Sequence, residues 1–202
     1  IISFFGGFIL GENSAGAGGY VGDLSWIKKN IEIFKNNSTL EAIKHPDIFG
    51  NRPPLIYIIN KFFNPFFYDL ERYRICVFVL SLVGPFFLFI GLKIKFKNIK
   101  TEYLAVLSVL ILLSPYYRTS GFWALNENYG VISAIISLMF LNLSLLKNSL
   151  DGLKEKFYLL CTVFFSSSCV YFDQKLVIIP IICFFSFFYY LKKTSTRIFI
   201  FF

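Results

Sequence analysis

The sequence predicts an all-α protein, a polytopic bundle of transmembrane helices with about seven spans. The first reason is composition: of 202 residues, 56% are hydrophobic, 20% are aromatic and only 16% are charged, whereas a soluble domain is roughly a quarter charged. The second is that long apolar runs alternate with polar connectors, and a spanning helix needs about 20 mostly apolar residues. The third is that the basic residues gather in alternate connectors, which is typical of membrane proteins.

The expected spans follow the apolar runs in order. The run 1–10 has half the length of a span, and 198–202 begins another, so we expect both terminal spans to be truncated. The spans between them are expected at 73–92, 102–116, 130–146, 157–172 and 176–191. We therefore expect residues 1–202 to form the N-terminal part of one transmembrane domain. In it, residues 11–72 make a large first outer loop and residues 73–202 make the helices.

The distribution of Lys and Arg predicts the orientation. Of the short connectors, those on one side carry only Arg118 and Lys175, and those on the other carry Lys93, Lys95, Lys97, Lys100, Lys147, Lys154, Lys156, Lys192, Lys193 and Arg197. The positive-inside rule puts the larger set in the cytoplasm and residues 11–72, 117–129 and 173–175 outside. The net charge of +8 then serves topology and anionic headgroups. We expect a multi-pass protein of the bacterial inner (plasma) membrane, with membrane lipids but no nucleic acid as partners.

The first outer loop is expected to contain its own short helices. Apolar residues recur at helical spacing over 24–35, and Ser38 with Glu41 forms a capping-box pattern that opens a second helix. Pro53 and Pro54 favour the start of a third helix over 55–63. The helix over 24–35 is expected to lie at the membrane interface. The helix over 55–63 is too short to span, so we expect it to be interfacial or re-entrant.

Ionisable residues near the predicted outer membrane edges are the candidates for chemistry. Glu12 and Asp23 lie in a glycine-rich segment directly after the first span, and both are candidate catalytic acids, although Asp23 also fits the N-cap of the next helix. The candidate substrate-binding residues are Arg52, Arg72, Arg74, Arg118, Glu127, Asp173 and Lys175. The alternative is that these are solvated loop residues. The lone His45 predicts no metal site, and no cofactor is indicated.

The order of these features resembles the GT-C glycosyltransferases, in particular the branch with protein O-mannosyltransferases and lipid A aminoarabinose transferases. The resemblance rests on an acidic first outer loop, the segment Arg-Pro-Pro-Leu-Ile-Tyr-Ile-Ile at 52–59, and Arg72 with Arg74 at the start of the next span. The family segment often reads His-Pro-Pro-Leu-x-Tyr. Two features depart from it: Arg52 replaces the histidine, and Glu12 and Asp23 are separated where the family has adjacent acids.

The resemblance implies transfer of a sugar from a polyprenyl-phosphate donor to a glycan, lipid or protein acceptor outside the cytoplasm. Asp23 or Glu12 would accept the proton of the attacking hydroxyl, and Arg72, Arg74 or Arg118 would hold the leaving lipid phosphate. Whether a divalent metal assists stays open.

Two other classes also fit the composition. A transporter or lipid flippase would use edge charges as a substrate path, but it is expected to carry charges near the centre of its spans, and none is present there. A non-catalytic assembly subunit would not need a large structured outer loop. Four aromatic residues near the predicted outer boundary could stack on a sugar but are interpreted as interfacial belt residues: Tyr57, Tyr116, Tyr117 and Trp123.

Overall fold

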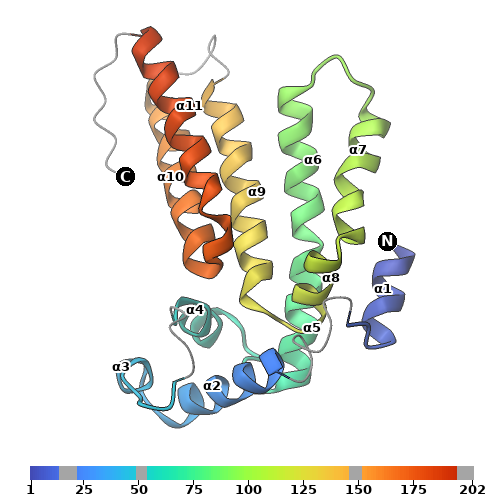
Figure 1. Ribbon diagram of the computed structural model, residues 1–202, viewed down its shortest axis with the longest axis vertical. Helices are drawn as coiled ribbons and strands as arrows, with labels where there is room; N and C mark the ends of the chain where they lie inside the picture. The colour runs from blue at the N-terminus through green and yellow to red at the C-terminus, as the bar shows by residue number, and fades with distance from the viewer. Residues whose placement is uncertain (14–21, 49–53, 146–151, 195–202) are drawn as a thin grey trace. The chain divides into compact units, whose positions relative to one another are not determined.

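The computed structural model describes residues 1–13, 22–48, 54–145 and 152–194, and these residues contain helices but no strand (Figure 1). The all-α prediction is therefore confirmed for the described chain. The chain forms two compact units. The first unit comprises Ile1–Pro85 and Val109–Tyr129, and the second comprises Phe86–Ser108 and Gly130–Phe202.

Two helical segments among the described residues are long and apolar enough to cross a membrane. One is Leu70–Lys95, in which α5 (Leu70–Ser81) and α6 (Val83–Lys95) follow each other with only Leu82 between them. The other is α9 (Asn126–Leu145). Two further apolar helices, Thr101–Leu113 and Gln174–Tyr189, are shorter. The seven-span count therefore stays a prediction.

The helices expected in the first outer loop are present, as α2 (Leu24–Asn36), α3 (Thr39–Ile43) and α4 (Leu55–Phe63). The apolar stripe of α2 is buried within the first unit and not turned outward. The ring of Phe34 in α2 stacks on Tyr57 in α4 at 5.6 Å, and Asn30 Nδ2 donates to the Tyr57 hydroxyl at 3.0 Å. The apolar face of α2 therefore packs against α4, because two short amphipathic helices bury more apolar area together than apart.

One of the two predicted helix caps is present and one is not. Ser38 Oγ accepts from the Glu41 backbone N–H, and Glu41 Oε2 accepts from the Ser38 N–H at 3.0 Å, so the capping box of α3 is confirmed. Asp23 lies at the N-cap of α2, but its side chain makes no capping hydrogen bond. Its backbone already has helical dihedrals, with φ −68° and ψ −41°. A capping residue needs extended dihedrals to turn its side chain back on the helix.

The chain around the third expected span differs from the prediction. The helix α7 (Thr101–Val109) continues as the 3-10 helix η2 (Leu110–Leu113) and then ends. Ser114 caps a new helix, α8 (Pro115–Phe122), with Pro115 in its first turn. Residues 117–122, in the expected outer connector 117–129, are all buried, so the alternative of solvated loop residues does not hold for this part of the chain. The pattern that predicts a surface helix, one apolar face and one polar face, is absent from a helix buried on all sides.

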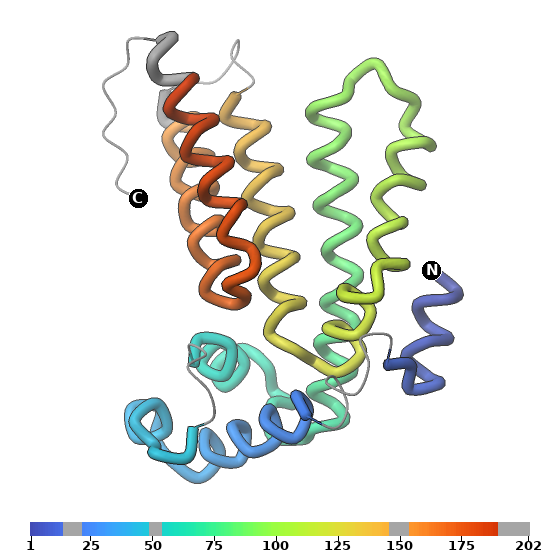
Figure 2. Tube along the Cα trace, in the orientation of Figure 1, coloured from blue at the N-terminus to red at the C-terminus, as the bar shows by residue number. Residues whose placement is uncertain are grey.

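The second unit is built around α9, α10 (Gly152–Phe172) and α11 (Ile178–Thr194), which run side by side in Figure 2. Their shared core contains Leu141, Leu159, Cys183 and Phe187. Ser137 Oγ also donates across the interface to the Thr162 carbonyl at 3.1 Å. The tight turn expected at 173–175 is confirmed, since the 3-10 helix η3 (Gln174–Leu176) joins α10 to α11.

Candidate functional site

The end of α1 (Ile2–Ile9) fixes the position of Glu12. Gly11 takes the left-handed conformation, φ 66°, in which glycine has no steric penalty. Its N–H donates to the Phe8 carbonyl at 3.2 Å, and the Glu12 N–H donates to the Gly7 carbonyl at 2.8 Å. This pair of bonds is a Schellman motif. The Glu12 carbonyl also accepts from Trp123 Nε1 at 3.0 Å, so the backbone of Glu12 is held from both sides.

The Glu12 carboxylate forms a two-point ion pair with Arg118 of α8. Arg118 Nε donates to Glu12 Oε1 at 2.8 Å, and Arg118 Nη2 donates to Glu12 Oε2. The Arg118 side chain is 7% exposed and that of Glu12 is 34% exposed. Because paired N–H groups match both oxygens of a carboxylate, this geometry is among the strongest of side-chain contacts.

Arg118 has no N–H group left for a ligand. Besides its two bonds to Glu12, Nη1 donates to Ser3 Oγ at 3.3 Å and to the Leu112 carbonyl at 3.2 Å. Nη2 also donates to the Ser3 carbonyl at 2.9 Å. A guanidinium carries five N–H groups, and all five are therefore used within the protein. Arg118 ties α1, η2 and α8 together and cannot also hold a phosphate without breaking one of these bonds.

Gly7 makes room for this ion pair. A Cβ at position 7 would meet the Arg118 guanidinium, would lie 2.5 Å from Glu12 Oε2, and would lie 2.9 Å from the Phe122 ring. These separations are far below van der Waals contact, so a larger residue at position 7 would have to displace the ion pair. The neighbouring Gly6 has nothing within 4 Å of such an atom.

Arg74 of α5 lies beside the same segments but keeps unused donors. Its guanidinium lies 4.3 Å from the Trp123 ring centroid and 5.4 Å from that of Phe8. Its Nε donates to the Phe122 carbonyl at 3.1 Å, and its Nη1 pairs with the Glu71 carboxylate at 2.9 Å. Nη2 makes no hydrogen bond to any described residue. The side chain is only 12% exposed, and aromatic rings hold the cation in a fixed orientation.

The third arginine, Arg72, is in a different environment. Its side chain is 65% exposed and its Nε lies 3.3 Å from Asp69 Oδ2. An exposed pair of this kind is weak and flexible. Of Arg72, Arg74 and Arg118, only Arg74 combines near-complete burial, rigid stacking and free N–H groups, which are the properties that an anion-binding arginine needs.

The turn after α8 brings Phe122 and Trp123 to the site. Ala124 is buried and has φ 55°, a left-handed conformation that costs a residue with a Cβ roughly 1–2 kcal/mol. The Leu125 N–H donates to the Ser120 carbonyl at 2.9 Å, which closes the helix end in the same manner as at Gly11. Backbone strain of this kind persists where surrounding contacts hold the turn in place.

A buried polar network lies behind the site and links α5, α8 and α9. The Tyr117 hydroxyl donates to the Ser81 carbonyl at 2.6 Å, and Ser81 Oγ donates to Asn128 Oδ1 at 3.1 Å. Burial raises the pKa of the Tyr117 phenol well above its ordinary value, so its hydroxyl keeps its proton and remains a donor. A Cβ on Gly121 would lie 2.5 Å from Ser81 Oγ, so α5 and α8 are in close contact.

The other predicted site residues are not brought into this cluster. Glu127 is buried in the first turn of α9, where a carboxylate complements the helix dipole. Asp173 belongs to the second unit and accepts from the Lys175 N–H at 3.1 Å, so it caps η3. Asp23 is half-buried at the start of α2. Arg52 lies outside the described residues.

Sequence patterns did not point to several residues that build the site. Gly7, Phe8 and Ser3 lie within an apolar run whose composition indicates only a membrane span. The one available signal was the Gly6-Gly7 pair, because adjacent glycines inside a helix are costly unless something approaches the backbone closely. Trp123 was interpreted as a belt residue, yet it binds Glu12 and stacks on Arg74.

These elements define an all-helical protein with a charged, aromatic-lined cluster where α1, α5 and α8 meet. Within the described ranges no three His, Cys, Asp or Glu side chains converge in a way that would hold a metal ion. Comparison of the chain with known protein families, with curated proteins and with solved structures finds no match.

Proposed function

We propose that the chain belongs to a membrane glycosyltransferase that moves a sugar from a polyprenyl-phosphate donor to an acceptor on the non-cytoplasmic face. The observation that carries this proposal is the cluster of Glu12, Arg74, Arg118 and Trp123. Residues separated by more than 100 positions meet there, on the side that the charge distribution predicts to be outside. A rigid arginine with unused N–H groups beside an acidic segment suits a reaction in which a phosphate leaves.

The membrane part of the proposal is supported by exposed apolar surface. In the apolar window of Leu70–Lys95, 33% of the residues are buried, whereas the core helix of a soluble protein is mostly buried. Large apolar side chains such as Phe86 and Val79 are more than half exposed on this segment. Exposed apolar side chains of this number in a water-soluble protein would favour aggregation, and lipid is the solvent that removes this cost.

We assign the leaving phosphate to Arg74. As the acceptor oxygen bonds to the anomeric carbon, the bond from that carbon to the phosphate oxygen breaks, and its electron pair leaves with the phosphate. The developing charge is stabilised by the Arg74 Nη2 N–H groups, which have no hydrogen-bond partner among the described residues. The cation–π contacts of the Arg74 guanidinium with the Trp123 and Phe8 rings keep it in place. One attack of this kind inverts the anomeric centre.

We assign the acceptor proton to Asp23 and a positioning role to Glu12. Both Glu12 carboxylate oxygens accept hydrogen bonds from Arg118, so protonation of Glu12 would break one of these bonds. The Asp23 carboxylate, by contrast, is not used in capping α2. In this assignment Glu12 holds Arg118, and the pair fixes the end of α1 beside Trp123.

The experiment is sugar transfer by the full-length protein with a polyprenyl-phosphate sugar donor and a membrane-extract acceptor. Asp23→Asn should leave the melting temperature unchanged, because no capping bond is lost, and should reduce transfer roughly 10²–10⁴-fold. Glu12→Gln should lower the melting temperature, because it leaves the Arg118 charge buried without its partner. If Glu12→Gln alone abolished transfer at an unchanged melting temperature, the base would be Glu12. If neither substitution changed transfer, the catalytic proposal would be wrong and a transporter would become the leading alternative.

The same assay tests the phosphate-binding assignment. Arg74→Gln should lower kcat by about 10²–10³-fold, as expected when a donor to the developing charge is removed. Arg72→Gln is the matched control on the same helix and should lose much less, because its side chain is exposed and paired with Asp69. Equal losses from the two variants would contradict the role of Arg74.

A further inference from the structure

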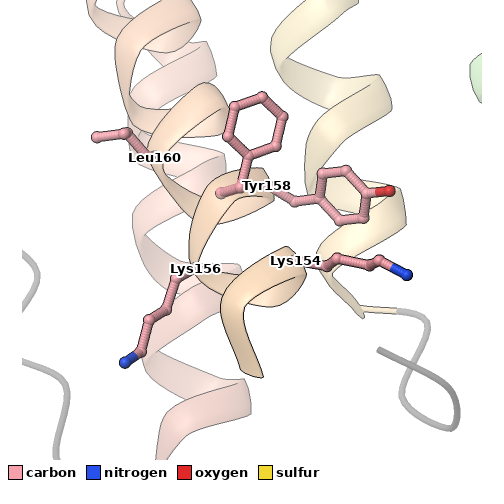
Figure 3. Close-up of a pocket in the computed structure, with 5 residues that line it drawn as sticks. Lys154, Lys156, Tyr158 and Leu160 are labelled. Carbon is pink, nitrogen blue, oxygen red and sulfur yellow. The ribbon is translucent and has the colours of Figure 1, made fainter. Parts of the chain in front are cut away.

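We propose that the first turns of α10 form a binding site for one acidic phospholipid, at Lys154, Lys156, Phe157, Tyr158 and Leu160. These residues line a hollow of about 640 Å³ in the second unit (Figure 3). None of the candidate residues for sugar transfer lines it. The inference rests on the membrane location proposed above but not on glycosyl transfer.

An apolar stripe on α10 begins in the hollow and continues beyond it. Phe157, Leu160 and Phe164 follow at intervals of three and four residues, so they share one face of α10, and each is more than half exposed. Phe157 is held by ring contacts with Phe140 of α9 at 6.4 Å and with Tyr158 at 6.0 Å. The stripe is therefore a fixed apolar track that runs along the helix from its N-terminal end.

Two lysines flank the stripe at that end. Figure 3 shows Lys154 and Lys156 pointing to opposite sides of α10. At helical spacing, Phe157 lies between them around the helix axis. Both side chains are exposed. Glu155 lies two residues from Phe157, which places it on the opposite face of the helix. The N-terminal end of a helix also carries a partial positive charge, so the hollow is positive at one end and apolar along its length.

A ligand that complements this surface has an anionic head and an apolar tail. The head would lie between the two ammonium groups, and one acyl chain would follow Phe157, Leu160 and Phe164. Lys154 and Lys156 belong to the set of basic residues that predicts the cytoplasmic side, where the leaflet is rich in anionic lipid. An acidic glycerophospholipid of that leaflet satisfies both requirements, whereas a soluble anion would leave the apolar track uncovered.

Native mass spectrometry of the purified full chain in detergent, titrated with phosphatidylglycerol or phosphatidylcholine, tests the proposal. We expect one phosphatidylglycerol to bind with preference over phosphatidylcholine. The double variant Lys154→Gln/Lys156→Gln should weaken that binding roughly tenfold or more. Each lysine near an anionic lipid surface contributes to the attraction for the headgroup, and the variant removes both.

The matched control is Lys93→Gln/Lys95→Gln, which removes the same charge from another predicted cytoplasmic segment. It should leave the affinity for phosphatidylglycerol unchanged. Equal binding of the two lipids, wild-type affinity in the Lys154/Lys156 variant, or an equal loss in both double variants would each overturn the proposal. The measurement needs no enzymatic activity, so its failure would leave the transfer proposal standing, and failure of the transfer assay would leave the lipid site standing.

Discussion

Arg118 and Arg74 lie in the same cluster but differ in the number of N–H groups that they can offer to a ligand. Arg118 uses all five within the protein, and its removal would leave Glu12 without a partner. Arg74 uses Nε and Nη1 and keeps Nη2. Residue type alone does not separate the two roles, since both are buried arginines next to aromatic rings. The separation comes from counting donors and acceptors around each guanidinium.

Gly7→Ala should destabilise the protein because a methyl group would intrude on the Glu12–Arg118 pair. Overpacking of a filled site costs roughly 1–3 kcal/mol, and the ion pair would also be separated. The melting temperature of the purified protein should fall accordingly. Gly6→Ala is the matched control in the same helix: nothing lies within 4 Å of its Cβ position, and alanine is favoured over glycine in a helix by about 0.5–1 kcal/mol. A melting temperature for Gly7→Ala at or above that of Gly6→Ala would contradict the close approach.

At the scale of the helices, local patterns predicted those elements whose signals are local. The helices α2, α3 and α4 were predicted from periodicity, a capping box and a proline. The helices α2 and α4 lie within a residue of their predicted bounds, and α3 begins at the predicted capping box. The helix α8 was missed, although Ser114 and Pro115 are a start signal of the same kind. Its residues 117–122 are all buried, so no polar face repeats along it. Helices of this type cannot be recognised by amphipathic periodicity.

The capping box of α3 gives a pH-dependent contribution with a defined sign. The hydrogen bonds from Ser38 lower the pKa of the Glu41 carboxyl below its ordinary value of 4.5. A lowered pKa in the folded state means that the stabilisation is present above the unfolded pKa and is lost as the pH falls through the folded pKa. A carbon NMR titration of selectively labelled protein should therefore give a Glu41 midpoint below 4.5. Ser38→Ala should move this midpoint upward, and a midpoint that did not respond would show that the bonds to Ser38 are not its cause.

At the scale of the whole molecule, the candidate site depends on contacts that no local pattern encodes. Glu12 and Arg118 were both predicted as site residues, but as separate ones, because they are 106 positions apart in the chain. Their pairing follows from the way α1, η2 and α8 come together in the first unit. The candidate residues Asp173 and Lys175 instead form a turn of the second unit, where charge next to an apolar run has a capping role. The position of charged residues at predicted membrane edges thus identified candidate site residues. It could not distinguish those that lie in the cluster from those that form a turn.

The orientation of the chain is the property on which both proposals depend, and it follows from the unequal distribution of basic residues. Cysteines introduced one at a time by Lys44→Cys and Gln174→Cys, at two exposed positions, should react with a membrane-impermeant thiol reagent applied to intact cells. A cysteine at Asn98, also exposed, should react only after the cells are opened, because the connector around it carries Lys93, Lys95, Lys97 and Lys100 and is expected to stay in the cytoplasm. The unsubstituted chain measures the background from Cys76, Cys161, Cys169 and Cys183, which lie in helices. Labelling of Asn98→Cys in intact cells, with protection of Lys44→Cys, would reverse the topology. The Arg74 cluster would then face the cytoplasm, and the acidic-lipid site on α10 would face the outer leaflet.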